Sequence, residues 1–178
     1  MSWIKNDMVG LLFFGGIILG TNSCSSTNPP VYTGVKTNGT LAVSTVTSTA
    51  NGDYAPQNLV AIWIEDNSGK FIKTLLVKAQ SQMGYLSNWF NATNGNEVDA
   101  ITGATERAYG TLTCSWNGTD YQGTLVSDTT YRVCMELTDG HCSGNFSYFP
   151  FKKGTAANTQ SPANKPSFSS VSIKWTPK

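Results

Sequence analysis

The chain has 178 residues, a length that suits one domain. Its formal net charge is +1, only 13% of its residues are charged, and its one adjacent basic pair, Lys152-Lys153, is expected on a solvated face, so we expect no nucleic-acid partner. Glycine, threonine, serine and asparagine are abundant while helix formers are sparse, and this composition favours an all-β fold.

The N-terminus predicts a signal peptide over residues 1–23. A short basic region precedes an apolar run from Val9 to Gly20, which has signal-peptide length and is too short for a membrane span. Cys24 follows and opens a stretch rich in Ser, Thr, Asn and Pro, which resembles a bacterial lipoprotein signal. We therefore expect an exported protein in the periplasm or at the outer membrane, anchored by a lipid on Cys24. The alternative is ordinary cleavage near Ser23, which leaves Cys24 as a free or paired thiol.

The composition then predicts a disordered tether over residues 24–37 and a folded domain over residues 38–178. The first strand of the domain is expected from Thr40 to Ser48. The run from Asn58 to Glu65 is apolar, short and rich in β-branched residues, so it predicts a central strand buried on both faces. A polar turn and a return strand from Phe71 to Val77 complete a predicted hairpin.

The next segment breaks the strand pattern. Residues 84–90 predict a helical turn that packs Leu86, Trp89 and Phe90 over one edge of the sheet. A loop extends from Asn91 to about Gly110, and loops on a rigid scaffold commonly carry function.

This loop contains the string Asp99-Ala100-Ile101-Thr102-Gly103-Ala104-Thr105, of the form D-x-x-T-G-A-T. The string looks like the flavin attachment signal of exported bacterial redox proteins, in which a separate flavinyltransferase esterifies FMN through its phosphate onto the last threonine. The resemblance therefore implies a covalent FMN on Thr105, and the neighbouring positions of the site are Asp99, Thr102, Gly103 and Ala104.

The residue types in the string suit this chemistry. The acceptor must be a hydroxyl, Gly103 and Ala104 leave room for a bulky phosphoryl group, and Asp99 can order the turn by hydrogen bonding. One position departs from the pattern, because flavin carriers often place a second small hydroxyl residue where this chain has Glu106. The alternative is a tight turn capped by Asp99, with Gly103 in a left-handed conformation.

The remaining chain predicts further strands. A second hairpin is expected from Thr111–Trp116 and Tyr131–Leu137, joined by a polar connection. Two more strands are expected at Phe146–Phe151 and Ser167–Trp175, with a polar loop between them. About seven antiparallel strands over about 140 residues predict a β-sandwich.

The cysteines and the histidine limit the chemistry. An exported protein can oxidise its thiols, but Cys114, Cys134 and Cys142 cannot all pair within one chain. A Cys114–Cys134 bond would staple the second hairpin and a Cys134–Cys142 bond would close a shorter loop, and the sequence leaves both open. There is no C-x-x-C pair and His141 is the only histidine, so neither a thiol redox motif nor a His-based metal cluster is expected. His141 is expected to be a solvated loop residue beside Gly140 rather than a catalytic one. We also expect no enzymatic activity, since no serine elbow and no usefully spaced carboxylate pair occur.

Four blocks in one order resemble domain-of-unknown-function family 2271, a family of exported bacterial proteins. The blocks are an apolar strand with W-x-E-D, the D-A-x-T-G-A-T string, a W-x-G-x-D hairpin and a following glutamate, here Glu136. The pattern W-x-G-x-D-x-x-G…Y, from Trp116 to Tyr131, is also similar to the Ig-like domain of flagellar hook-capping proteins. The resemblance spans about Thr40 to Pro177. It implies an immunoglobulin-like β-sandwich whose partners are flavinyltransferases and membrane redox proteins, and it carries over no catalytic residue.

Most of these blocks also have a structural interpretation. Gly118 and Gly123 permit a tight connection, and Asp120 is expected to bond to backbone within it. Four aromatic residues are expected in the core rather than on a ligand platform: Trp63, Trp116, Tyr131 and Trp175.

The sequence supports two functions. The first is an exported, lipid-anchored Ig-like accessory or binding module of the cell envelope. Its most specific form is an electron-transfer accessory with FMN on Thr105, held near membrane redox proteins by the lipid on Cys24. The alternative is a structural or protein- or carbohydrate-binding module without a cofactor, which uses the exposed loop from Ser87 to Thr105 or surface tryptophans.

Overall fold

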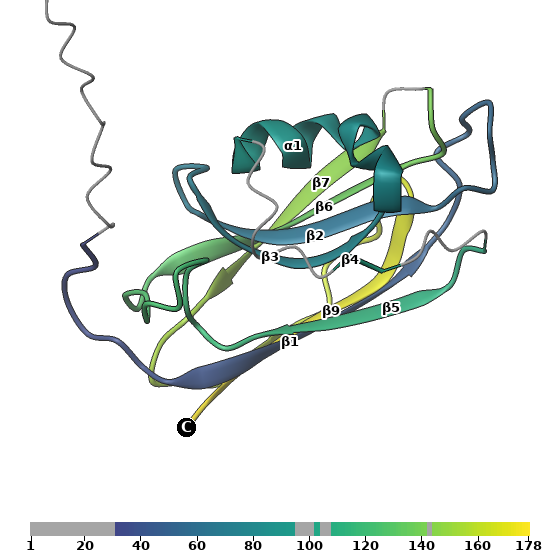
Figure 1. The fold of residues 1–178 in the computed structure, drawn as a ribbon. Helices are drawn as coiled ribbons and strands as arrows, with labels where there is room; N and C mark the ends of the chain where they lie inside the picture. Colours follow the sequence, from purple (N-terminus) through teal and green to yellow (C-terminus); the bar gives the residue numbers. More distant parts are fainter. Residues whose placement is uncertain (1–30, 95–101, 104–107, 142–143) are drawn as a thin grey trace, which may run out of the picture. The chain divides into compact units, whose positions relative to one another are not determined.

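The computed structural model describes residues 31–94, 102–103, 108–141 and 144–178 (Figure 1). All of the elements in these ranges belong to one unit, residues 32–178. The predicted signal peptide and the lipidation site at Cys24 lie outside the described residues, as do Asp99, Ala104 and Thr105 of the D-x-x-T-G-A-T string.

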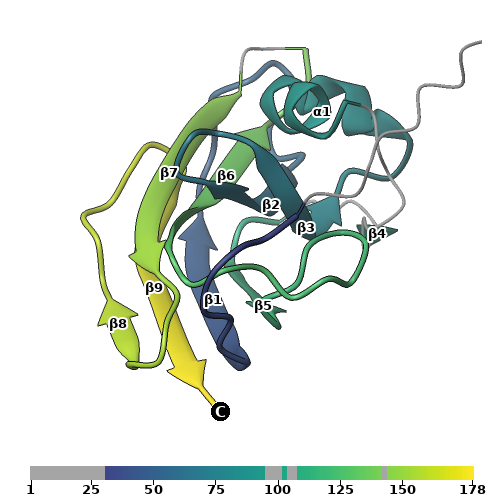
Figure 2. The same cartoon turned by 90° about the vertical axis from the view of Figure 1, so that its left-hand side faces the viewer.

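The fold is all-β, as predicted, with two sheets packed face to face and a small helical layer on one of them (Figures 1 and 2). One sheet has the order β5-β1-β9-β8 and the other the order β4-β3-β2-β6-β7. Within both sheets all pairs are antiparallel, except that β4 pairs with β3 in parallel. The elements are β1 (Gly39–Thr47), β2 (Leu59–Asp66), β3 (Phe71–Lys78), the 3₁₀ helix η1 (Gln80–Tyr85), α1 (Ser87–Thr93), β4 (Thr102–Gly103), β5 (Thr111–Trp116), β6 (Thr130–Thr138), β7 (Asn145–Lys152), β8 (Asn158–Gln160) and β9 (Phe168–Pro177).

The first predicted hairpin is confirmed as β2 and β3, and β2 is buried along almost its whole length. Its two faces serve different cores, because successive strand residues point to opposite sides. Val60, Ile62 and Ile64 enter the core between the two sheets, whereas Ala61 and Trp63 enter a second core under the helical layer. This double burial is the physical reason for the continuous apolar run in the sequence.

The second predicted hairpin is wrong. β5 pairs with β1 in one sheet, from Leu41 opposite Trp116 to Val46 opposite Thr111. β6 pairs instead with β2 and β7 in the other sheet. The connection of residues 117–129 therefore crosses between the sheets, and a local turn pattern cannot distinguish such a crossing from a hairpin.

The four core aromatics are confirmed as core, with Trp63, Trp116, Tyr131 and Trp175 all at most 2% exposed. Trp116, Tyr131 and Trp175 form one ring cluster between the sheets, with centroids 5.4 Å apart for Trp116–Tyr131 and 6.3 Å apart for Trp116–Trp175. Trp89 is buried too, so every tryptophan of the described residues is internal and a tryptophan surface for sugars is wrong for this part of the chain.

The predicted helical turn is confirmed as η1 and α1, which cover the outer face of β3, β2 and β6 (Figure 1). Leu86 and Trp89 are buried there, but Phe90 is 42% exposed, so its predicted burial is wrong. Asn94 ends the helix in the left-handed conformation, with φ of +52°. Within the described residues, neither helix has the length and the apolar character that would let it cross a membrane.

Glu136 explains where the helix begins. The residue before α1, Leu86, offers no side-chain cap. The fully buried carboxylate of Glu136 on β6 instead accepts hydrogen bonds from the backbone amides of Asn88, at 3.1 Å, and Trp89, at 2.8 Å. It thereby satisfies donors of the first turn from a neighbouring strand and places negative charge at the positive end of the helix.

Candidate functional site

Four loops converge at one end of the sandwich, at the right in Figure 1. They are residues 48–58 between β1 and β2, η1 after β3, residues 108–110 before β5, and residues 139–141 after β6. We call this region the motif end, because β4 also lies there. Thr102 and Gly103 of the D-x-x-T-G-A-T string pair with Val77 and Lys78, the last residues of β3. The structure thus anchors the middle of the string to the sheet through its backbone.

Asp139 holds the loops of the motif end together. It is fully buried, and its carboxylate accepts hydrogen bonds from Thr49 Oγ1 at 2.8 Å, the Ala50 amide at 2.8 Å and Tyr109 Oη at 2.5 Å. The amide of Gln57 adds a longer contact at 3.4 Å. Burial opposes ionisation, but these hydrogen bonds outweigh it and hold the pKa of Asp139 below its ordinary value.

Asn58 holds the chain where it leaves the string. Its Nδ2 donates to the backbone carbonyl of Ala108 at 2.9 Å, and Ala108 lies three residues after Thr105. The residue is fully buried in a left-handed conformation with φ of +43°, and its Oδ1 has no hydrogen-bond partner in the described part of the chain. An unsatisfied buried carbonyl is uncommon in proteins, and it marks this position as one that can accept another donor.

Three aromatic rings from three segments meet at the motif end. Tyr85 Oη and His141 Nε2 are linked by a hydrogen bond of 2.8 Å, and the ring centroids of Tyr54 and His141 are 4.8 Å apart. Tyr54 is 52% exposed, and a hollow of about 310 Å³ lies along residues 54–57. His141 itself has φ of +47° directly after Gly140 with φ of +72°, so the backbone turns sharply to present the ring.

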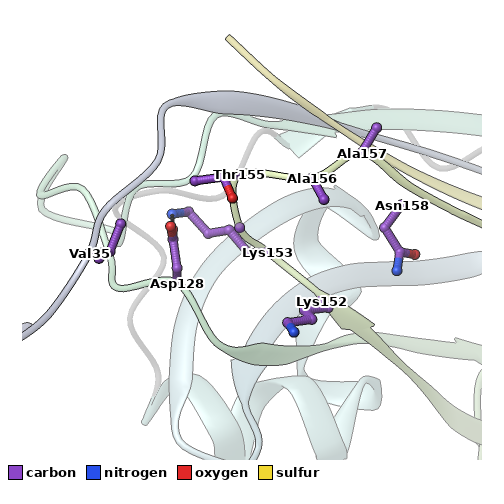
Figure 3. A pocket seen from close by; sticks show the side chains of 9 residues that line it. Val35, Asp128, Lys152, Lys153, Thr155, Ala156, Ala157 and Asn158 are labelled. Carbon is purple, nitrogen blue, oxygen red and sulfur yellow. Dashed lines mark hydrogen bonds and ion pairs between the residues drawn. The ribbon is translucent and has the colours of Figure 1, made fainter.

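The opposite end is closed by a buried ion pair, and we call it the ion-pair end. Lys153 is fully buried, and its ammonium donates to the Val126 carbonyl at 3.0 Å and to Asp128 Oδ1 at 2.6 Å (Figure 3). Asp128 also accepts the Thr37 amide at 2.8 Å. The pKa of Asp128 lies below its ordinary value because hydrogen bonds from Lys153 and Thr37 outweigh desolvation. Lys152 is exposed as predicted, but the solvated face predicted for Lys153 is wrong.

A pocket of about 340 Å³ opens beside this pair (Figure 3). It is lined by Val35, Asp128 and residues 152–158. The charged groups of Lys153 and Asp128 are already engaged with each other, with Val126 and with Thr37. The buried pair therefore offers a ligand little charge that is not already neutralised, and we regard it as structural. Lys152, which also lines the pocket, is exposed and lies outside this pair.

The W-x-G-x-D block is a structural turn at this same end. Asp120 Oδ1 accepts the amides of Gln122 at 3.0 Å and Thr124 at 2.8 Å, which confirms the predicted backbone role of this residue. Gly118 and Gly123 have φ of +81° and +85°, values that a side chain would strain. Trp116 Nε1 closes the turn by donating to the Thr119 carbonyl.

One further surface carries exposed aromatic side chains. Phe146 and Tyr148 project from the edge strand β7 and are 39% and 50% exposed. Arg132 lies over the Tyr148 ring at 4.8 Å and is paired with Glu65 at 2.9 Å. A hollow of about 480 Å³ runs beside these rings and Lys165. We call this set the β7 surface.

The described cysteines are not bonded to each other. Cys114 lies on β5 and Cys134 on β6, in different sheets, and both thiols are free, so a Cys114–Cys134 staple is wrong. Cys142 lies outside the described residues, but Cys134 is a free thiol, so the Cys134–Cys142 pairing is wrong as well. Desolvation raises the pKa of the Cys114 thiol to about 12, which keeps it protonated near neutral pH. Among the described residues, no three His, Cys, Asp or Glu side chains gather as a metal site would require.

Sequence reasoning missed the residues that build the motif end. Asp139, Asn58, Tyr54 and Tyr85 lie far from the string in sequence, and His141 was expected to be a solvated loop residue. His141 is indeed exposed, but it contacts two tyrosine rings. The available signal for this loop was a glycine between two polar residues directly after an apolar strand, Asp139-Gly140-His141.

The chain was compared with known proteins. No match was found among curated proteins or among solved structures, so the immunoglobulin-like and hook-capping resemblances stay predictions. The model of one family, described as "Predicted periplasmic protein (DUF2271)", matches residues 40–167, from β1 to the residue before β9. The match covers more than half of the chain and confirms the resemblance read from the four blocks, so the protein belongs to the DUF2271 family of predicted periplasmic proteins.

Proposed function

We propose that this chain is a periplasmic redox accessory that carries FMN esterified through its phosphate to Thr105. The observation that carries the proposal is the D-x-x-T-G-A-T string, whose Thr102 and Gly103 add a short parallel strand to the end of β3. This pairing gives an acceptor two residues later a fixed starting point on the scaffold. The periplasmic description of the family supports the proposal, because flavin attachment to such a string belongs to exported proteins.

The attachment is a phosphoryl transfer. The Thr105 hydroxyl oxygen attacks the FMN phosphorus of an activated flavin donor that contains a phosphoanhydride. The P–O bond to Thr105 forms as the anhydride P–O bond breaks, the remainder of the donor departs with the bonding pair, and the hydroxyl proton is released. A partner flavinyltransferase supplies the catalysis, so the chain itself acts as a substrate and a carrier.

The residues of the motif end suit a planar, hydrogen-bonding cofactor. Isoalloxazine is flat and aromatic, and the exposed rings of Tyr54 and His141 lie at this end beside the half-buried ring of Tyr85. Asn58 Oδ1 is a buried acceptor that bonds to none of the residues that the structure describes. A lipid on Cys24 would hold such a carrier beside membrane redox proteins, which are its proposed electron donors and acceptors.

The test is the intact mass of the mature protein, expressed in an exporting host together with a flavinyltransferase. We expect the mass to rise by one esterified FMN, to remain unmodified in Thr105→Ala, and to rise again in Thr105→Ser, which keeps a hydroxyl. Thr111→Ala, an exposed threonine on β5, is the control and should carry FMN. An unmodified wild-type mass overturns the proposal, and FMN on Thr105→Ala overturns the site. A lipid on Cys24 would add its own mass, which Cys24→Ser removes.

The second candidate is a binding module without cofactor, and the β7 surface favours it. Phe146 and Tyr148 are exposed beside an arginine held in place by Glu65, an arrangement that suits a protein or carbohydrate partner. Screening a panel of oligosaccharides by chemical-shift mapping tests the carbohydrate form. Shifts confined to Phe146 and Tyr148, and lost in Tyr148→Ala, support it, whereas no shifts with any sugar remove it.

A further inference from the structure

We propose that the exposed ring of Tyr54, held in place by His141 and Tyr85, whose rings are tilted 42° and 49° within this cluster, is the platform on which the isoalloxazine ring of the attached FMN stacks. This inference rests on the proposed function, because it concerns the same cofactor. It assigns a role to three residues that no sequence motif marks.

The first support is the position of the cluster in the fold. Gly103, before the attachment residue, pairs with Lys78, and η1 begins two residues after Lys78 and ends at Tyr85. Ala108, after the attachment residue, is bonded to Asn58, and Tyr54 lies in the same loop as Asn58. Both described flanks of the string are thus tied to segments that carry the rings.

The second support is the way in which the rings are held. Asp139 bonds to Tyr109 and to the amide of Gln57, which connects the residues before β5 with the Tyr54 loop. The Tyr85–His141 hydrogen bond of 2.8 Å joins η1 to the loop after β6. The side-chain amide of Gln57 also lies against Gly140, where an added Cβ would be 2.6 Å from its Oε1. These contacts place three rings from distant parts of the sequence in fixed positions.

The third support is exposure. Aromatic rings that serve only packing are normally buried, and the core aromatic side chains of this domain are buried in this way. Tyr54 instead remains 52% exposed beside a hollow of about 310 Å³, although its ring contacts His141. A second flat ring can therefore stack on Tyr54 without displacing any contact described above, and aromatic pairs favour such offset stacking.

The chemistry gives this contact a signature. A tyrosine stacked on excited isoalloxazine donates one electron to it and regains that electron on charge recombination, so emission is quenched with no net reaction. Phenylalanine stacks equally well but is a much poorer electron donor. Stacking and quenching can therefore be separated at one position.

The experiment uses the full flavinylated protein and measures three quantities: FMN mass, flavin emission, and quenching by added iodide, which reports access to the ring. In Tyr54→Ala we expect FMN to be present, emission to rise, and iodide access to increase, with the stacked-to-unstacked ratio falling roughly two- to tenfold. In Tyr54→Phe we expect emission to rise while iodide access stays low. Tyr148→Ala, on the β7 surface at 50% exposure, is the matched control and should change neither.

The outcomes separate this inference from the proposed function. FMN attached normally, with the same emission and iodide access in Tyr54→Ala as in the wild type, overturns the platform and leaves the carrier. Equal changes in Tyr148→Ala also overturn it. Absence of FMN from the wild type overturns the carrier, and the platform falls with it. If Tyr54→Ala does not fold, Tyr54→Phe still decides, because unchanged emission in that variant contradicts a stacked Tyr54.

Discussion

At the ion-pair end of the sandwich a buried lysine gathers the loops, whereas at the motif end a buried aspartate does so. Lys153 forms an ion pair with Asp128, and the segment of residues 33–37 is hydrogen-bonded to Asp128. Among the described residues, the donors to Asp139 are neutral and come from Thr49, Tyr109 and backbone amides. The first arrangement closes its end with an ion pair. The second fixes the loops by hydrogen bonds and leaves the rings of Tyr54 and His141 exposed.

This difference indicates that one end stabilises the fold while the other also exposes side chains that a ligand can contact. A paired, buried charge has little left to offer a ligand, since its interactions are already made within the protein. Neutral donors around one carboxylate fix several loops where they leave the sheets. The exposed side chains of those loops stay available for contacts with a ligand. The ion-pair end is thus expected to matter mainly for stability and the motif end for both stability and ligand contact.

The largest effect is expected at the ion-pair end. Asp128→Ala leaves the fully buried Lys153 ammonium without its anionic partner, so the free energy of unfolding should fall by about 3 kcal/mol. Urea unfolding of the pure domain measures this change. Adding Lys153→Met to Asp128→Ala should recover much of the loss, because it removes the stranded charge. No recovery in the double variant would show that the pair is not the cause.

The next effect is expected at the motif end. Asp139→Asn removes a charged acceptor from hydrogen bonds with Thr49, Tyr109 and Ala50, and the free energy of unfolding should fall by about 2 kcal/mol. Asp53→Asn, in the same loop region and exposed, is the control and should change little. Hydrogen exchange of the amides of residues 49–58 locates the loss. A loss of amide protection spread evenly over both ends would contradict the assignment of Asp139 to the motif end alone.

The acid stability of the protein follows from the same carboxylates. The pKa values of Asp139, Asp128 and Asp66 lie below their ordinary values in the folded state. The stability they contribute is therefore present above the unfolded pKa of about 4 and is lost as pH falls through the lower folded values. Urea midpoints measured downward from pH 6 should fall most steeply below that unfolded value, and Asp139→Asn should flatten the slope. A midpoint that rises on acidification contradicts this.

A smaller effect is expected in the helical layer between the two ends. Glu136→Gln keeps an acceptor but removes negative charge from the first turn of α1, so the free energy of unfolding should fall by about 1 kcal/mol. The change should appear as faster hydrogen exchange of the Asn88 and Trp89 amides. Unchanged protection of these two amides would remove Glu136 as the cap.

The smallest stability effects are expected for exposed side chains at each end. Lys152→Ala beside the buried Lys153, and Tyr54→Ala at the motif end, should each change the free energy of unfolding by less than about 0.5 kcal/mol. Thermal melts of the two variants check this. A large loss in Tyr54→Ala would mean that the ring packs for stability, which would weaken the case that it serves a ligand.

The strands with strong patterns were predictable from the sequence alone. The run from Asn58 to Glu65 is apolar throughout because β2 has a core on each face, and no other environment requires that pattern in a short strand. β9 alternates, with Val171, Ile173 and Trp175 buried, because only one of its faces meets a core. The order of the family blocks likewise depends only on the sequence, and the family match confirms it.

The partners of those strands and the composition of the motif end were decided by tertiary structure. Nothing local indicates that β5 pairs with β1 rather than with β6, because backbone pairing carries no residue code and loop length permits both. Asp139, Tyr54 and Tyr85 meet only after the sheets have packed, which brings distant loops to one end. The sequence by itself therefore determined the seven longer strands of the described residues, the export signal as a prediction and the D-x-x-T-G-A-T string. It missed the short strands β4 and β8, which lie in segments predicted as loops, because two or three residues carry no strand pattern. The packing of the two sheets determined which side chains surround that string.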